Sequence, residues 1–148
     1  MEILERVDTT DTYALDLNLE KKIIAMRFYG DMPDEDYREI WEKALKIVIE
    51  HQVKNYVIDQ SKIGTVSFTA RAWVLVKVLP QVRKKIGMPL FVGILPSENL
   101  VHSTGMEFIA KGFQKLSGMK IRKFRSEEEC VGWLTLSEEE KINALNKK

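Results

Sequence analysis

The sequence predicts an α/β protein with a mixed, mostly parallel sheet, an N-terminal β-hairpin and flanking helices, in the order ββαβαβαβα. Beyond residue 30, short apolar runs alternate with segments of helical periodicity, and helices of crossover length between strands favour parallel pairing. In residues 13–29, two runs in which apolar residues alternate with smaller or polar ones flank a polar turn, which is typical of a β-hairpin. The 148 residues suffice for one core, so residues 1–148 are expected to form one domain whose last ten or so residues fray.

The hairpin and the helix that follows it are predicted from a change in the spacing of the apolar residues. Large apolar residues occupy every second position of residues 13–19, and residues 23–29 resume the strand pattern after a charged turn. From residue 33 the apolar residues recur at three- and four-residue spacing, which predicts a helix. Asp31 is the expected N-cap of this helix, and Pro33 is tolerated in its first turn.

The central part is predicted to be strand, helix and strand. Residues 56–59 form a short β-rich run typical of a buried strand, and residues 89–95 form another. Between them a helix is expected from about Ser67 to Ile86, followed by Gly87 just past its end. Pro80 lies inside this helix, so a kink or a break is expected there.

The last third is predicted to be a helix, a strand and two short helices. Residues 97–116 have helical periodicity, and residues 119–125 alternate apolar and basic side chains as a half-exposed strand does. Two capping boxes then indicate two helix starts, formed by Ser126 with Glu129 and by Ser137 with Glu140.

Composition narrows the class of protein. The chain has 23 Lys and Arg against 22 Asp and Glu, a net charge of +1. No overall field therefore favours nucleic acid or an anionic membrane. Cys130 is the single cysteine and has no partner for an internal disulfide, while the N-terminus lacks the apolar core of a signal peptide. No apolar run is long enough to span a bilayer. The expected protein is cytoplasmic, with no transmembrane segment and no nucleic-acid partner.

Catalytic and metal-binding motifs are not found. The sequence lacks GxGxxG, GxxxxGK[ST] and GxSxG, and His51 and His102 lie on different predicted helices, apart from Cys130. Ser103 follows His102 directly, and neighbours on a helix point about 100° apart. Acidic neighbours would raise the pKa of Cys130, which is interpreted as a core residue. No metal, no cofactor and no catalytic residue is expected, and the enzyme alternative is a minor activity of the loop from Asp59 to Arg71.

The candidate site is the segment in which an apolar strand leads into a helix. It contains an acid, hydroxyl groups and a cation, namely Asp59, Ser61, Ser67, Thr69 and Arg71. Ligands bind outside the carboxyl ends of strands in open α/β sheets, and a helix start offers N–H donors to an anion or a phosphoryl group. In the alternative interpretation, Asp59 and Ser61 shape a turn and Ser67 caps the helix.

Several of these features together resemble a known family. Val57-Ile58-Asp59, then Ser61 and Ile63, precede a hydroxyl-bearing helix start, and the segments PLFVGILP and KFRSEEECVGWL follow in order. This arrangement resembles the SpoIIAA-like group of the STAS fold, which is related to anti-sigma-factor antagonists and to CRAL-TRIO lipid-binding domains. The resemblance covers roughly residues 10 to 135.

The resemblance implies a regulatory or binding module. STAS antagonists exchange protein partners when a serine at this helix start is phosphorylated. Alignment from Asp59 places Phe68 at the acceptor position, so the switch is not carried over, and only Ser67 or Thr69 could replace it by a shift of register. The expected function is therefore a non-enzymatic module that acts through protein partners or a small anionic ligand, without an intact serine switch.

Two further expectations concern ligands and assembly. As in CRAL-TRIO relatives, the apolar helix 70–79 could serve a lipid or other apolar ligand, which is the alternative function. A homodimer is also expected if the aromatic residues form an exposed cluster. These aromatic residues are Trp41, Phe68, Trp73 and Trp133.

Overall fold

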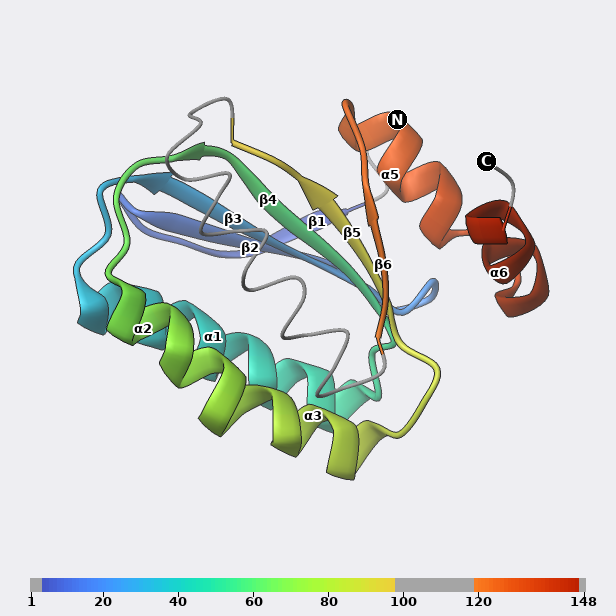
Figure 1. Ribbon diagram of the computed structural model, residues 1–148, viewed down its shortest axis with the longest axis horizontal. Coiled ribbons are helices and arrows are strands. Elements are labelled where there is room, and N and C mark those ends of the chain that lie inside the picture. The colour runs from blue at the N-terminus through green and yellow to red at the C-terminus, as the bar shows by residue number, and fades with distance from the viewer. Residues whose placement is uncertain (1–3, 98–118, 147–148) are drawn as a thin grey trace.

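The described part of the chain is built around a six-stranded sheet. The computed structural model describes residues 4–97 and 119–146. The strands lie side by side in sequence order from β1 to β6, with α1, α2 and α3 along one face and α5 against the other (Figure 1). The strands are β1 (Glu5–Thr9), β2 (Tyr13–Asn18), β3 (Ile23–Gly30), β4 (Asn55–Ile63), β5 (Phe91–Leu95) and β6 (Lys120–Lys123). The helices are α1 (Asp34–His51), α2 (Phe68–Trp73), the π-helical segment η1 (Val74–Val78), α3 (Leu79–Ile86), α5 (Glu127–Leu134) and α6 (Glu138–Asn146).

The predicted α/β class and mixed sheet are confirmed. β2 and β3 form the expected antiparallel hairpin, and β3, β4, β5 and β6 pair in parallel. An additional strand, β1, pairs antiparallel with β2 and was not predicted. β1 is an edge strand whose residues are mostly exposed and partly charged, and its register shifts between Arg6 and Asp8. Its sequence therefore lacks the alternation of apolar and polar residues that would have predicted a strand. Charge and irregularity of this kind are common ways to protect a sheet edge.

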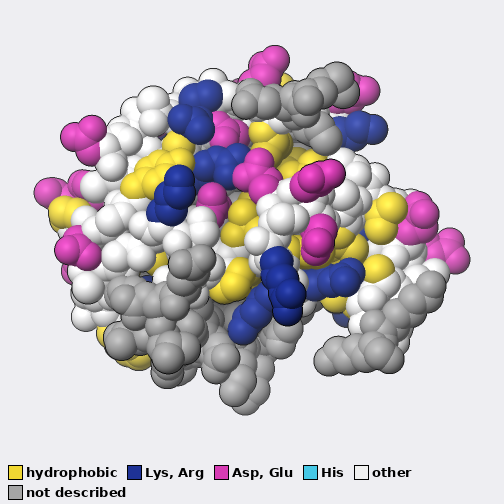
Figure 2. All heavy atoms as spheres, turned by 90° about the horizontal axis from the view of Figure 1, so that it is seen from above, with side chains coloured by type: hydrophobic (Ala, Val, Ile, Leu, Met, Phe, Trp, Pro, Cys, Tyr) yellow, Lys and Arg dark blue, Asp and Glu magenta, His cyan; other side chains and the backbone are white. Residues whose placement is uncertain are grey.

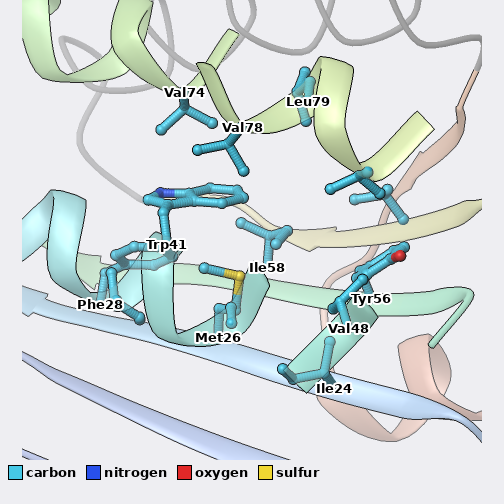
Figure 3. Close-up of a cluster of buried hydrophobic side chains, with 14 of the residues drawn as sticks. Ile24, Met26, Phe28, Trp41, Val48, Tyr56, Ile58, Val74, Val78 and Leu79 are labelled. Carbon is cyan, nitrogen blue, oxygen red and sulfur yellow. The ribbon is translucent and has the colours of Figure 1, made fainter. Parts of the chain in front are cut away.

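Two hydrophobic cores lie on opposite faces of the sheet because side chains alternate along each strand. Ile24, Met26 and Phe28 of β3 point toward α1 and α3, and Figure 3 shows Trp41 of α1 near Phe28 and Met26. Ile23 and Ala25 point to the other face, where the second core includes Cys130 and Trp133 of α5. The expectation that Cys130 is a core residue is confirmed, since it is fully buried.

The start of α1 differs from the expectation. The N-cap position is Pro33 and makes no side-chain cap hydrogen bond, so the assignment of Asp31 as N-cap is wrong. Asp31 Oδ1 instead accepts a hydrogen bond from the Thr65 N–H at 2.8 Å. The Gly64 N–H donates to the Gly30 carbonyl at 2.7 Å beside it. Asp31 thus fastens the loop after β3 to the loop after β4.

The helical run from Phe68 to Ile86 contains a widened turn. Its start is capped as the alternative interpretation of Ser67 predicted, with the Ala70 N–H donating to Ser67 Oγ at 3.0 Å. The α-helix is interrupted over η1, immediately before Pro80, which lies in the first turn of α3. Proline lacks an N–H and clashes with the carbonyl four residues earlier in a regular helix. The interruption is therefore a π-helical widening, and Gly87 ends the run as expected.

The C-terminal helices follow the predicted capping boxes. Ser126 Oγ accepts from the Glu129 N–H at 3.2 Å, while Ser137 and Glu140 exchange two hydrogen bonds. The predicted helix 97–116, with His102 and Ser103, lies almost entirely outside the described residues. Among the helices of residues 4–97 and 119–146, none has the length and apolar character needed to cross a membrane.

Candidate functional site

The five candidate residues from Asp59 to Arg71 do not form one site. β4 continues to Ile63, four residues beyond the predicted end of that strand. Asp59 and Ser61 therefore lie inside a strand, whereas Ser67 and Thr69 follow a loop. Asp59 interacts on the α5 side of the sheet, and Ser67 interacts with α1 on the other side.

Asp59 and Ser61 are linked by two hydrogen bonds within β4. Asp59 Oδ1 accepts from the Ser61 hydroxyl at 2.6 Å and from the Ser61 N–H at 3.1 Å. Its other oxygen accepts from Arg27 Nη1 at 3.2 Å. A short polar side chain that bonds the backbone two residues on shapes the chain locally.

Ser67 lies beside a group of acids. The Ser67 hydroxyl donates to Asp34 Oδ1 at 2.7 Å while it also caps α2. The first turn of α1 contains Asp34, Glu35 and Asp36. An added phosphoryl group on Ser67 would meet this negative charge, which opposes it. Thr69 is exposed at the same helix start.

Arg71 lies in the interior rather than at the helix start. Its side chain is 4% exposed, and Nη1 has no hydrogen-bond partner within the described ranges. Burial raises the pKa of the fully buried Tyr37, and the nearby positive charge of Arg71 offsets part of that shift. Arg71 is thus directed into the core, near Tyr37.

Charged side chains instead gather around Arg27 in an open pocket on the α5 face of the sheet. We call this the Arg27 pocket, and its volume is about 1010 Å³. Figure 2 views this face and shows Lys and Arg side chains next to Asp and Glu side chains. The charged and polar residues that line it are Arg6, Asp16, Arg27, Tyr29, Asp59, Lys62, Glu127 and Glu128.

Arg27 is the centre of an ion network. Its Nε donates to Asp16 Oδ2 at 2.6 Å, and its Nη1 donates to Asp59 Oδ2 at 3.2 Å and to Glu127 Oε1. Arg6 Nε donates to the other oxygen of Asp16. Burial lowers the pKa of Arg27, but the hydrogen bonds to Glu127 and Asp16 outweigh this and raise it above its usual range. The Arg27 guanidinium is thereby charged and fixed in orientation.

The strand geometry explains how these residues meet. Arg27 and Tyr29 are two apart on β3 and so point to the same face. A register shift between β3 and β4 places Lys62 opposite Tyr29 while Asp59 remains opposite Arg27. Arg27 could have been found from the sequence, because it is two and four residues from Ala25 and Ile23 and therefore shares their buried face of the strand. Lys62 could not, because its position opposite Tyr29 depends on the register shift between β3 and β4.

The pocket has chemically different sides. Arg6 and Lys62 are the more exposed cations on the strand side, with the Arg6 side chain 48% exposed. Glu127 and Glu128 come from the first turn of α5, with the Glu127 side chain 43% exposed. Asp16 is 5% exposed and lies beneath the two arginines.

The network around Asp16 predicts a loss of stability in acid. Burial would raise the pKa of Asp16, but hydrogen bonds from Arg6 and Arg27 outweigh it and lower the pKa below its ordinary 3.8. Because the folded pKa is the lower one, the stabilisation is present above pH 4 and is lost as the pH falls further. We expect the unfolding free energy of the wild type to fall more steeply below about pH 4 than that of Asp16→Asn, measured by urea denaturation at each pH. Equal slopes in the two proteins would contradict the assignment.

The structure also resembles solved structures. No protein-family model matches the sequence, and no curated protein matches it. An uncharacterised DUF3478-family protein with a SpoIIAA-like fold, from Shewanella loihica PV-4, superposes with a TM-score of 0.53 at 16% identity, over 88% of this chain and 91% of that chain. SiaC of Pseudomonas aeruginosa gives a TM-score of 0.48 at 13% identity, over 82% of this chain and 98% of that one. The first similarity shows the fold alone. The chain has a SpoIIAA-like fold, as the resemblance in its sequence implied.

Proposed function

We propose that the protein is a non-enzymatic binding or regulatory module that takes up a small polar ligand carrying an anionic group in the Arg27 pocket. One observation carries the proposal. Three strands, β1, β3 and β4, direct Arg6, Arg27 and Lys62 into the same open pocket, beside Tyr29. Small-molecule sites are concave, and a few convergent polar groups fix the orientation of the ligand in them.

The pocket retains hydrogen-bond donors for an anion. Arg27 uses Nε and Nη1 in its ion pairs, while its Nη2 makes no hydrogen bond to any described residue. Lys62 makes no ion pair within residues 4–97 and 119–146. Asp16 already holds the guanidinium groups of Arg6 and Arg27. A ligand would thus meet cations that are oriented before it binds, which lowers the entropic cost of binding.

The acids of α5 indicate which groups the other end of the ligand carries. The pocket is lined by three positive residues and four negative ones. A simple anion would satisfy Arg6 and Lys62 and leave Glu127 and Glu128 facing it. Hydrogen-bond donors or an ammonium group on the same ligand would complement these two acids. The ligand class is therefore a polar molecule with an anionic group at one end and donors at the other.

The chemistry of the described residues supports binding rather than catalysis. Burial raises the pKa of the Cys130 thiol to about 12, helped by the charges of Glu127 and Asp59. A thiol with this pKa is not a thiolate nucleophile at neutral pH. The Ser61 hydroxyl donates to a carboxylate, and no imidazole lies among the residues that line this pocket. The parts of the chain that the structure describes hold no group of three or more metal-ligating side chains.

The lipid-binding alternative has less support. Between α1, η1, α3 and the sheet lies an apolar cavity lined by Trp41, Tyr56 and Met119, among other residues. Its volume is about 30 Å³, which is room for about one or two water molecules. An acyl chain needs several times more space, so we favour the Arg27 pocket.

A titration followed by NMR tests the proposal. Inorganic phosphate, citrate and L-glutamate are added in turn to ¹⁵N-labelled protein, and amide shifts are followed at Tyr29, Lys62 and Gly132. We expect at least one probe to shift these amides, and Lys62→Gln to weaken its binding about tenfold. Lys84→Gln, an exposed lysine in the last turn of α3, serves as the matched control. No shifts with any of the three probes, or equal affinity in the Lys62 and Lys84 variants, would overturn the proposal.

A further inference from the structure

A second hollow lies on the opposite side of the molecule, between α1 and the helical run from Phe68 to Ile86. We call it the outer groove, and its volume is about 800 Å³. Leu45, Ile49, Trp73 and Val78 give it an apolar floor, while Glu42 and Lys46 lie at its rim. It shares no lining residue with the Arg27 pocket.

The π-helical segment creates the floor of this groove. Trp73 and Val78 are five residues apart, so a regular α-helix would point them about 140° apart. A π-helical turn contains more residues than an α-helical turn, because its hydrogen bonds run from i to i+5, and this reduces the angle between such positions. The Leu79 N–H donates to the Val74 carbonyl within this turn, which shows the wider spacing. The widening therefore places Trp73 and Val78 in the same groove.

Some apolar side chains on this helical run are exposed. Phe68 and Val76 are each 65% exposed, and the half-buried Trp73 ring carries the Arg38 guanidinium 5.5 Å from its centre. The other two aromatic residues of the predicted cluster, Trp41 and Trp133, are buried in separate cores. Apolar surface beside a groove with charged edges is characteristic of protein contacts.

The charges along α1 suggest which protein this surface contacts. Five acids outnumber Arg38 in the first half of the helix, whereas Lys43 and Lys46 outnumber Glu50 in the second half. Two copies of such a helix in antiparallel contact place the acidic half of each against the basic half of the other. A two-fold axis produces this arrangement, because the same surface is then used twice.

Two residues are available to form the contacts. Glu39 accepts from the Tyr13 hydroxyl, and Lys43 donates to Asp8 and to Tyr13, so both are held within the chain. Glu42 and Lys46 are exposed and make no ion pair with the described residues. An axis near position 44 would set Glu42 of each copy opposite Lys46 of the other.

We propose that the protein forms a symmetric dimer through the outer groove, in which a second copy of this chain covers Trp73 and pairs Glu42 with Lys46 across the interface. The contact is independent of any ligand in the Arg27 pocket. The two faces of the sheet then have separate tasks, since one face binds a ligand and the other binds a second subunit.

Charge-swap variants in sedimentation velocity test the dimer. Glu42→Lys sets two lysines against each other in its own dimer, and Lys46→Glu sets two glutamates against each other. We expect each variant alone to weaken dimerisation about tenfold or more. An equimolar mixture of the two variants, and the double variant Glu42→Lys/Lys46→Glu, should both recover the wild-type dimer. Lys84→Glu, outside the groove, should dimerise as the wild type does.

Each other outcome contradicts the proposal. A wild-type protein that stays monomeric over about a hundredfold range of concentration has no such dimer. A dimer that both single variants leave unchanged uses another surface. If the single variants dissociate and the mixture does not recover, Glu42 and Lys46 do not face each other.

Discussion

Replacing Arg27 with methionine is expected to lower the free energy of unfolding by about 3 kcal/mol or more. Arg27 forms ion pairs with Asp16, Asp59 and Glu127, and its side chain is only 11% exposed. Without it, Asp16 keeps Arg6 as its remaining ion-pair partner among the described residues, while Asp59 and Glu127 lose theirs. Removing one member of a buried network costs more than the pair contributes, because a largely buried carboxylate such as Asp59 is left desolvated without its ion-pair partner.

Urea denaturation followed by tryptophan fluorescence measures this loss. The double variant Arg27→Met/Asp59→Asn should recover part of it, since one of the unpaired carboxylates becomes neutral. Arg125→Met is the matched control because Arg125 is exposed, and its effect should stay within about 0.5 kcal/mol. A loss of less than about 1 kcal/mol in Arg27→Met would show that the network contributes little to the fold.

Gly64→Ala is expected to cost several kcal/mol or to prevent folding altogether. A Cβ atom at this position would lie 2.3 Å from Asp31 Oδ1, 2.6 Å from the carbonyl carbon of Gly30 and 2.7 Å from the Asp31 nitrogen. Two of these are backbone atoms that cannot rotate away. Relief would require the two loops to separate, which would break the bond between the Gly64 N–H and the Gly30 carbonyl.

Gly132→Ala provides the comparison for Gly64→Ala. No atom lies within 4 Å of a Cβ built at Gly132, which is inside α5. Alanine is preferred over glycine in a helix, so this variant should gain up to about 1 kcal/mol. Thermal unfolding monitored by circular dichroism compares the two. Similar midpoints for Gly64→Ala and the wild type would contradict the close approach of the loops.

The sequence alone was sufficient for most of the elements. The period-two pattern of residues 13–29 correctly predicted the hairpin of β2 and β3, and the three- and four-residue spacing after Pro33 predicted α1. Ser67, Ser126 and Ser137 cap helices as their spacing indicated. These signals are local, because a cap or a hydrophobic period depends on neighbours within a few residues.

Elements that depend on distant partners were missed. β1 is exposed and charged, and only pairing with β2 makes it a strand. β4 was predicted to end at residue 59, yet pairing with β3 extends it to Ile63. Asp31 has the composition of a cap, but the Thr65 N–H competes for its carboxylate. In each case a contact between segments far apart in sequence outweighed the local preference.

The candidate site shows the same division. The sequence by itself determined an α/β fold, a capped helix start at Ser67 and a cluster of polar residues between Asp59 and Arg71. The tertiary structure decided that these residues separate to two faces of the sheet, and that Arg27 joins Asp16, Asp59 and Glu127 from three other elements. There are two physical reasons. The chain leaves β4 at Ile63 and continues into α2, which packs on the other face of the sheet, so Ser67 and Arg71 part from Asp59. Side chains on one face of neighbouring strands share a surface, which brings Arg27 to Asp16 and Asp59 although these residues are far apart in sequence.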